Sequence, residues 1–387
     1  MKYKLKDLAV IKRGASPRPI NEYVSEKGYP WLKISDFSLN DKFVYKTKEF
    51  IIEAGLKKTR YVKSGTLIVT NSATPGIPIF LMKDMCLHDG FLYFESISPK
   101  IDKEYLYYFI LNNRSKLIKL GNGSVFVNLK KEILENYEIE LPSIDVQHKI
   151  ARYLSAIDEK IKLNNEINDN LLKQAIEIYS DLIKDKDKNG CIGDYCTIKS
   201  GFAFKSNWWT DNGVKVVKIG SINQDNLDLN SCSYVSSENA VRAKEFIVKG
   251  GDLLIAMTGA TIGKFAMVPS LNEGIYVNQR VGKFFLGDNP ISRLPYIYCT
   301  LKQPDIYSEI INRGQGSAQP NISGGDIMSI PCVILSKEDI DDFNQKCKPI
   351  FSLMIDRQKE NADLSDLRDS LLPKLMSGEI DVDSIEL

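Results

Sequence analysis

Apolar residues recur at alternating steps of four and three through the middle of the chain, from about residue 144 to residue 183. This a/d heptad pattern continues for four heptads without Gly or Pro and predicts one long amphipathic helix. At about 1.5 Å per residue, the helix is roughly 60 Å long. The expected seam consists of Ile150, Leu154, Ile157, Ile161, Asn164, Asn168, Leu171, Ala175 and Ile178. Because so narrow a stripe needs a partner, we expect a second helix to cover it.

The best candidate partner is a second helical stretch at about 339–376, whose pattern is less regular. Heptad spacing is kept by Ile350, Leu353, Leu364, Leu367 and Leu371, while Arg357 and Glu360 occupy the middle positions. The first seam is also polar at its centre. Buried polar residues at seam positions fix the register of a helix pair at some loss of stability. We therefore expect the two helices to pair with each other as an antiparallel coiled coil.

The rest of the chain contains one globular unit twice. The aligned segments are 5–14 with 192–201, 31–37 with 216–222, 65–69 with 251–255, 73–76 with 260–263, and 121–124 plus Asn128 with 314–317 plus Asn321. Strands are expected at 66–70, 91–94 and 253–256, and short helices at 105–111 and 296–301. We predict an α+β fold in four parts: globular domains over 1–143 and 187–337, and helical spacers over 144–186 and 338–387.

Composition narrows the functional classes. With 387 residues, 43% hydrophobic and 26% charged, the chain is long enough for two or three globular domains. It has no apolar signal region and no apolar run near the roughly 20 residues that span a bilayer, so we expect a cytoplasmic protein without membrane contact. Seven Cys without a Cys-x-x-Cys pair and two His favour neither a metal site nor His-based catalysis. We expect no cofactor.

Charge is unevenly distributed, although the net charge is only +1. Residues 1–65 contain 15 Lys and Arg against 7 Asp and Glu, a net of +8. Residues 338–387 contain 6 against 13, a net of −7. This asymmetry is compatible with a polyanion that meets only the first region. Two differently solvated surfaces would explain it equally well.

Six motifs occur in a fixed order: Gly-Phe-Ala-Phe-Lys-Ser at 201–206, Lys-Ile-Gly-Ser-Ile at 218–222, Asp-Leu-Leu-Ile-Ala-Met-Thr-Gly-Ala-Thr-Ile-Gly at 252–263, Val-Asn-Gln-Arg-Val at 277–281, Gly-Gln-Gly-Ser-Ala-Gln-Pro-Asn-Ile at 314–322, and Leu-Arg-Asp-Ser-Leu-Leu-Pro-Lys-Leu-Met-Ser-Gly-Glu-Ile at 367–380. Together with the duplication, they resemble the specificity subunit of type I restriction-modification systems over essentially the whole chain. The first domain departs from the pattern, with Phe126 in place of Gln319 and Asn71-Ser72 in place of Met-Thr. No half-site sequence is therefore carried over.

The resemblance implies a non-catalytic subunit that recognises double-stranded DNA. Each target-recognition domain would read one half of a bipartite site, and the paired helices would measure the unread spacer. The helices would also dock two methyltransferase subunits, which join restriction–translocase subunits in the full complex.

Candidate DNA contacts are side chains that match base edges or bind phosphate. In the first domain they are Arg13, Arg18, Lys33, Ser35, Asn71, Thr74, His88, Ser124 and Asn128. In the second domain they are Trp208, Lys218, Ser221, Thr258, Thr261, Lys264, Gln279, Arg280, Gln315, Ser317, Gln319 and Asn321. Three structural alternatives stay open: a tight turn for 314–322, a strand-edge cap for Gln279-Arg280, and a core position for Trp208-Trp209.

Two other hypotheses deserve comparison. A self-contained enzyme would need a cofactor pocket, but the segment 259–265 has three residues between its glycines and a Phe where a phosphate-binding loop has Ser or Thr. Asn289-Pro-Ile-Ser292 also lacks the aromatic residue of an adenine-methyltransferase motif. A helical scaffold that has lost DNA binding would assemble with partners but show no salt-sensitive DNA affinity.

Overall fold

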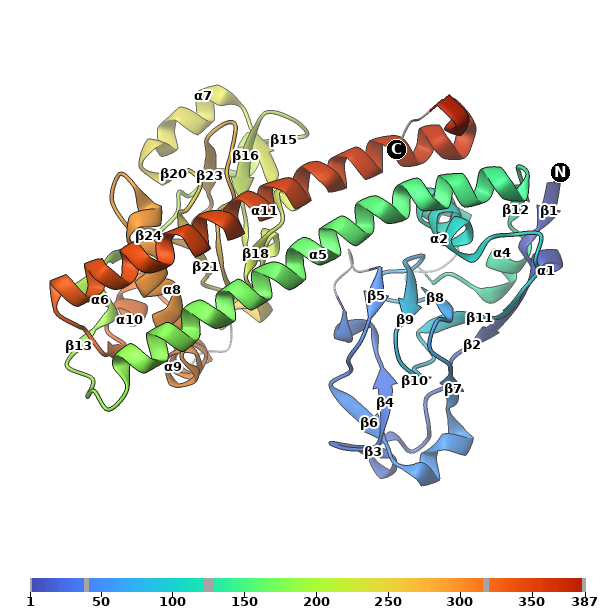
Figure 1. Ribbon diagram of the computed structural model, residues 1–387, viewed down its shortest axis with the longest axis horizontal. Helices are drawn as coiled ribbons and strands as arrows, with labels where there is room; N and C mark the ends of the chain where they lie inside the picture. The colour runs from blue at the N-terminus through green and yellow to red at the C-terminus, as the bar shows by residue number, and fades with distance from the viewer. Residues whose placement is uncertain (1, 38–41, 121–127, 316–319, 385–387) are drawn as a thin grey trace. The chain divides into compact units, whose positions relative to one another are not determined.

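The computed structural model describes residues 2–37, 42–120, 128–315 and 320–384 (Figure 1). The chain divides into two compact units, Met1–Glu159 with Ser365–Leu387 and Lys160–Leu364. The division crosses the two longest helices, α5 (Ile144–Ile183) and α11 (Lys337–Ser377). Both helices were predicted from heptad spacing, and their bounds confirm that prediction to within a residue or two.

The first unit contains two five-stranded sheets. One sheet has the order β2 (Ala9–Arg13), β11 (Phe91–Ile97), β8 (Leu67–Thr70), β9 (Pro78–Leu81) and β5 (Phe43–Val44). The other has the order β3 (Val24–Ser25), β6 (Glu49–Ile51), β4 (Tyr29–Leu32), β10 (Met85–Leu87) and β7 (Arg60–Val62). A separate pair joins β1 (Lys2–Lys4) to β12 (Glu138–Glu140). The α-helices are α1 (Leu5–Leu8), α2 (Lys103–Asn112), α3 (Arg114–Leu120) and α4 (Lys131–Glu135), with 3-10 turns η1 (Ile20–Glu22), η2 (Ile34–Asp36), η3 (Glu53–Lys58) and η10 (Val382–Ser384).

The second unit repeats this architecture. One sheet has the order β14 (Thr197–Ser200), β24 (Val281–Phe285), β21 (Leu253–Ala256) and β22 (Phe265–Met267). The other has the order β15 (Trp209–Thr210), β19 (Ser233–Val235), β16 (Val214–Val217), β23 (Ile275–Val277) and β20 (Ile247–Val248). Two short pairs are β13 (Gly190–Cys191) with β25 (Pro331–Cys332), and β17 (Ile222–Asn223) with β18 (Asn226–Leu227).

The helices of the second unit follow the same sequence order as those of the first. They are α6 (Ile192–Tyr195), α7 (Ser237–Ala240), α8 (Leu294–Lys302), α9 (Pro304–Gly314) and α10 (Gly324–Met328). The 3-10 turns are η4 (Ser206–Trp208), η5 (Ile219–Ser221), η6 (Leu229–Ser231), η7 (Val241–Phe246), η8 (Gly259–Thr261) and η9 (Pro290–Ser292). The expected strands at 66–70, 91–94 and 253–256 and helices at 105–111 and 296–301 are therefore confirmed, to within a few residues at their ends.

The strand orders establish the internal repeat in three dimensions. The two units share one parallel strand pair, β4 with β10 in the first and β16 with β23 in the second, and these pairs have the same register. The units differ at one sheet edge, where β5 pairs parallel with β9, while the second unit has the β17–β18 hairpin instead. The mixed α and β composition agrees with the predicted α+β fold.

Each unit buries part of both long helices in its own core. In the first unit, Leu154 of α5 and Leu372 of α11 join a cluster that includes Leu67 and Tyr105. In the second, Tyr179 of α5 packs within 6 Å, ring centroid to ring centroid, of the Tyr296 and Phe343 rings. Aromatic burial of this kind contributes more than any surface polar contact to holding an element in place. The helices are therefore integral parts of the units.

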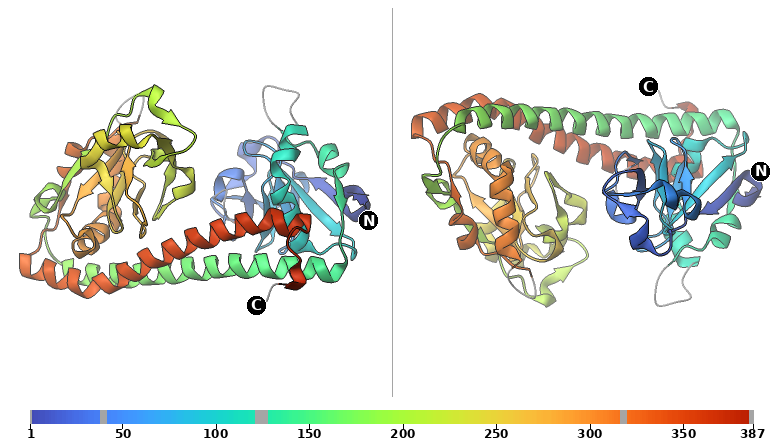
Figure 2. Two further views of the ribbon diagram at one scale, coloured as in Figure 1. Left: turned by 90° about the horizontal axis from the view of Figure 1, so that it is seen from above. Right: turned by 90° about the horizontal axis from the view of Figure 1, so that it is seen from below.

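Within each unit α5 also contacts α11, and residue numbers rise along one helix as they fall along the other. In the first unit Arg368 Nη1 donates to Asp158 Oδ1 at 2.9 Å. In the second unit Asn164 Nδ2 donates to Glu360 Oε2 at 2.8 Å, and Asn361 Nδ2 donates to Asn165 Oδ1 at 2.8 Å. In both views of Figure 2, α5 and α11 run side by side where they belong to the second unit. The predicted polar centre therefore makes contacts between the helices.

The predicted seam needs one correction at its end. Ile178 is 43% exposed, whereas Tyr179 is 1% exposed. The other seam positions are buried or half-buried, and Leu172 is more buried than Leu171. A strict 3.5-residue repeat drifts around a straight helix of 3.6 residues per turn by about 20° per heptad. Over four heptads this drift approaches the roughly 100° between consecutive residues, so the buried position moves on by one residue. The buried stripe of α5 follows the straight helix.

Candidate functional site

Connections far apart in sequence meet at one end of the sheets in the second unit. Gln279 N donates to Phe202 O at 2.9 Å, and Met257 N donates to Arg280 O at 3.0 Å. Backbone bonds of this kind hold a loop without using its side chains, which stay available for a ligand. We call this meeting point the second loop edge; it consists of residues 200–209, 218–221, 257–264, 278–280, 315, 320 and 321.

The first unit builds the corresponding meeting point from the same connections. Asn71 N donates to Gly90 O at 2.9 Å, and Leu129 N donates to Asn71 O at 2.8 Å. Ala15 N donates to Leu87 O at 3.0 Å. We call it the first loop edge; it consists of residues 13–18, 33–36, 71–76, 88–90 and 128. The two edges therefore share one backbone scaffold.

A glycine is required where the chain leaves the first strand of each edge. A Cβ on Gly14 would lie 2.2 Å from His88 O, and a Cβ on Gly201 would lie 2.4 Å from Val277 O. Real Cβ atoms do not approach a carbonyl oxygen so closely. The glycine that the two repeats share in sequence thus allows the backbone after β2 or β14 to approach the end of β10 or β23 closely.

Most of the predicted contact residues lie on these edges and are exposed or half-exposed. On the first edge they are Arg13, Arg18, Lys33, Ser35, Thr74, His88 and Asn128. On the second they are Trp208, Lys218, Thr258, Thr261, Lys264, Gln279, Arg280, Gln315 and Asn321. An isolated bridge between Thr258 and Asn321 joins two of the predicted segments directly. Ser124, Ser317 and Gln319 lie outside the described residues.

Two of the predicted contact residues are buried in the structure. Ser221 is fully buried and Asn71 is 6% exposed. The η5 turn directs Ser221 toward the Cys232 thiol, so its hydroxyl faces the interior. The Asn71 side chain donates to Asp89 O at 3.2 Å and so fastens the turn after β10. Both residues support the edges from within.

Aromatic rings and cations gather at one part of the second edge. The Trp208 ring lies parallel to Phe202 with centroids 6.4 Å apart, and the Arg242 guanidinium lies 5.2 Å from the Trp208 ring. Lys218 Nζ lies 3.5 Å from the Trp209 ring centroid, and burial lowers the pKa of that ammonium. Both tryptophans are half-buried, so the structure supports neither a fully buried nor a fully exposed pair.

The sequence did not single out Lys205, Arg242 or Phe202 at this place. Lys205 Nζ lies 5.5 Å from the Trp208 ring and belongs to the 201–206 motif, which could have indicated it. Arg242 comes from η7, and no sequence pattern connects that turn with Trp208. Its position depends on tertiary packing.

The first edge carries acids as well as cations. Lys33 Nζ lies 2.6 Å from Glu49 Oε2. Asp89 accepts from Ser16 Oγ at 2.7 Å and lies 3.9 Å from Arg13 Nη2. Burial lowers the pKa of His88, and the neighbouring Asp89 opposes that shift. The sequence analysis missed both acids.

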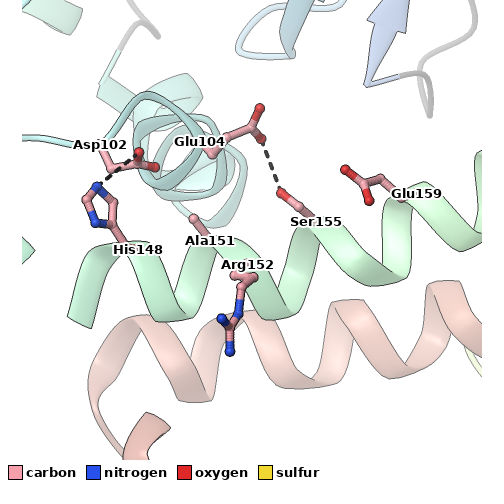
Figure 3. A pocket seen from close by; sticks show the side chains of 7 residues that line it. All are labelled: Asp102, Glu104, His148, Ala151, Arg152, Ser155 and Glu159. Carbon is pink, nitrogen blue, oxygen red and sulfur yellow. Dashed lines mark hydrogen bonds and ion pairs between the residues drawn. The ribbon is translucent and has the colours of Figure 1, made fainter. Parts of the chain in front are cut away.

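A polar pocket in the first unit lies between the start of α2 and α5 (Figure 3). Its side chains pair among themselves: His148 Nε2 lies 3.7 Å from Asp102 Oδ2, and Ser155 Oγ donates to Glu104 Oε2 at 3.3 Å. The pocket lining contains three carboxylates, those of Asp102, Glu104 and Glu159. An acidic lining of this kind does not suit a phosphate backbone.

Beside this pocket, a buried ionic network joins the first globular domain to both long helices. Lys42 is 7% exposed, and its Nζ lies 2.7 Å from Glu104 Oε2 and 3.5 Å from Asp158 Oδ2. Asp158 also accepts from Arg368 Nη1 at 2.9 Å and from the Tyr108 hydroxyl. Arg368 belongs to the motif at 367–380. The network explains structurally why that motif contains an arginine.

Within the described ranges, no group of three or more His, Cys, Asp or Glu side chains is arranged to hold a metal ion. Among the helices that the structure describes, none has the length and apolar character needed to cross a membrane.

Comparison with known proteins decides the family. The chain matches the family model described as type I restriction modification DNA specificity domain over residues 1–173 and 185–344. This chain belongs to the type I restriction-modification specificity subunits. As a specificity subunit it serves DNA sequence recognition and is a non-catalytic part of a multisubunit enzyme. The two matched regions fit the internal repeat.

Two curated relatives align with most of the length of this chain. The type I restriction enzyme MjaIX specificity subunit of Methanocaldococcus jannaschii is 26% identical, and the alignment covers 99% of this chain and 94% of that protein. The HindI specificity subunit of Haemophilus influenzae is 20% identical, with 88% and 92% covered. The crystal structure of a type I system S subunit from M. genitalium is 17% identical, covers 97% of this chain and 95% of its own, and has a TM-score of 0.52. That likeness shows a shared fold.

Proposed function

We propose that this specificity subunit reads a bipartite site in double-stranded DNA, with each loop edge reading one half. The observation that carries the proposal is the shared backbone scaffold of the two edges, on which the side chains differ. A fixed scaffold with exchanged polar groups is suited to two different base sequences, because base edges are distinguished by the donor and acceptor pattern that a protein presents. The domain division at 1–143 and 187–337 follows from this proposal.

The side chains at the edges suit both kinds of DNA contact. Exposed Arg13, Arg18 and Arg280 are suited to phosphates or to guanine, and Gln279, Gln315 and Asn321 to base edges. The predicted contacts Ser124, Ser317 and Gln319 belong to the proposal on sequence grounds alone. Ser221 and Asn71 do not, because they are buried.

We also propose that α5 and α11 form an antiparallel coiled coil that sets the length of the unread spacer. The contacts between Asn164 and Glu360 and between Asp158 and Arg368 support this pairing. Buried polar groups penalise a slipped register more than apolar ones do, since a slip leaves them without partners. The spacers at 144–186 and 338–387 would then act as a ruler.

The same helices would dock two methyltransferase subunits, and restriction–translocase subunits would join through the complex. Several large apolar side chains on the helices stay exposed: Leu163 at 51%, Leu353 at 42% and Leu367 at 47%. We assign these exposed leucines as candidate points of contact with the partner subunits. The complex would act in the cytoplasm, where the chromosomal DNA is, and this subunit would carry no cofactor of its own.

A binding experiment tests the two-part mode of recognition. The complex with its methyltransferase subunits is titrated with DNA that contains the full site, or the site with one half scrambled, at several salt concentrations. Scrambling either half is expected to weaken binding by the sum of several base-pair mismatches, each of which costs about 1–3 kcal/mol of binding free energy. The affinity for every DNA should fall steeply with rising salt concentration. If scrambling one half abolishes all sequence discrimination while scrambling the other half has no effect, the proposal of two separate readers is contradicted.

A further inference from the structure

The strand registers relate the two loop edges residue by residue. The pair β4–β10 and the pair β16–β23 are both parallel and have the same register. The turns that follow β10 and β23 therefore correspond, Asp89 to Gln279 and Gly90 to Arg280. An independent backbone bond agrees, because the carbonyls of Gly90 and Arg280 each accept from the residue after the neighbouring strand. An acid and a glycine in one turn thus occupy the positions that an amide and an arginine occupy in the other.

A second pair of positions changes in the same direction. Lys33 and Lys218 both follow the central parallel strand, and Glu49 and Ser233 hold the same register position on the neighbouring strand. Lys33 Nζ is paired with Glu49 at 2.6 Å. Lys218 has no such acid, and within the described part of the chain neither it nor Arg280 has a carboxylate within ion-pairing distance.

The two edges therefore offer opposite chemistry at their centres. The first presents carboxylates, which accept hydrogen bonds, and two of its cations, Lys33 and Arg13, lie beside them. The second presents the exposed side chains of Arg280 and Gln279 on a turn whose backbone is fixed at both residues. A fixed backbone reduces the conformational entropy that is lost when a long side chain binds.

Arginine at such a position has a preferred base. Its planar fork matches O6 and N7 of guanine bidentately, and no other base edge in the major groove offers two acceptors. A carboxylate is repelled by those acceptors and instead accepts from amino groups such as cytosine N4. Lys218 belongs to the adjoining segment, because the Asn278 N–H of the same turn donates to the carbonyl of Val217, the residue before Lys218, at 3.0 Å.

We propose that Arg280 reads a guanine in the half-site of the second unit, and that the first loop edge lacks this contact. The inference rests on the proposed function, since it assigns a base to one of the two readers. Lys218, on the adjoining segment, is a positioning residue that contributes positive potential, and the backbone of Gln279 continues the rigid turn.

The test separates base reading from phosphate binding. The complex is assembled with the wild-type chain or with one of four variants, and its methylated adenines are mapped. The variants are Arg280→Lys, Arg280→Ala, the double change Gln279→Asp/Arg280→Gly, which transplants the residues of the first turn into the second, and the control Arg152→Lys on α5. In the wild type, replacing the guanine is expected to lower modification by ~5- to 150-fold, as for one bidentate contact. Arg280→Lys keeps the charge but loses the fork, so it should relax this one position and leave the salt slope unchanged. The control should leave the site unaltered.

Two results would overturn the inference. One is a second half-site without any fixed guanine. The other is an Arg280→Lys complex that retains full guanine discrimination while Arg280→Ala weakens all sites equally, which is the behaviour of a phosphate contact. If the wild-type complex modifies no two-part motif at all, the proposed function fails instead. The transplant keeps the backbone of the turn and shows which half-site belongs to the second unit.

Discussion

Replacement of Asp158 by Ala is expected to destabilise the first unit more than any single change on the exposed helix faces. Asp158 is 6% exposed, and its carboxylate lies between two cations, Lys42 at 3.5 Å and Arg368 at 2.9 Å. The Tyr108 hydroxyl donates to the same carboxylate. Its removal leaves two largely buried cations without their shared anion.

The magnitude follows from what each cation retains. Breaking a buried ion pair typically costs 3–5 kcal/mol when the partner stays uncompensated. Here Lys42 keeps Glu104 at 2.7 Å, and Arg368 keeps the exposed Asp369 at 2.8 Å. We therefore expect the lower end, about 3 kcal/mol. In a unit of 150–250 residues this corresponds to a fall of about 6–12 °C in the midpoint of unfolding.

The assay is scanning calorimetry of the full chain, with hydrogen exchange of α5 amides to assign the transition to the first unit. The control is Gln358→Ala on α11, where the side chain makes one neutral hydrogen bond, Nε2 to Asp225 O at 2.8 Å. We expect about 1 kcal/mol there, in the second unit. Equal shifts for Asp158→Ala and Gln358→Ala would refute the argument that a shared buried carboxylate dominates this junction.

Three further predictions concern the helices and the loop edges. One heptad inserted into both long helices adds about 10.5 Å and should lengthen the unread gap of the methylated motif by roughly three base pairs; an unchanged gap would exclude the ruler. Gly201→Ala should destabilise the second unit by about 1–3 kcal/mol in a thermal melt, because the new Cβ would lie 2.4 Å from Val277 O. Gly220→Ala is the control, because a Cβ there meets nothing within 4 Å, and it should have little effect in the same melt. In urea unfolding, Tyr179→Ala should lower the free energy of unfolding by about 3–5 kcal/mol and Ile178→Ala by under about 0.5 kcal/mol. A larger loss for Ile178→Ala than for Tyr179→Ala would support the strict heptad seam instead.

The sequence predicted the long helices well because periodicity is a local signal that accumulates over many turns. It failed where tertiary packing chooses between adjacent residues of a stripe. On α11 it selected Leu353 and Leu367, which are exposed, whereas Phe351 and Met354 are buried. Around Leu353 that helix packs its buried face on the globular core of the second unit, and beyond Ser365 it packs on the core of the first. No spacing rule specifies which of two neighbouring apolar residues faces a core.

The loop edges were located by motifs rich in glycine and polar residues, which mark turns close to strand ends. Their chemistry was predicted less completely. The burial of Ser221 depends on the orientation of one 3-10 turn, and the pairing of Glu49 with Lys33 depends on strand register across 16 residues of chain. Register is a long-range property, so only the structure could show that Lys33 on the first edge is paired with an acid while Lys218 on the second, among the described residues, is not.

The most direct test is to map methylated adenines across a genome in cells that contain this subunit with its methyltransferase partners. Two separate readers on a fixed spacer predict a motif of two short specified blocks, separated by an unspecified gap of constant length. Substitutions on the first loop edge should alter one block only, and those on the second edge the other. A single continuous motif, or a gap that varies from site to site, would contradict the account.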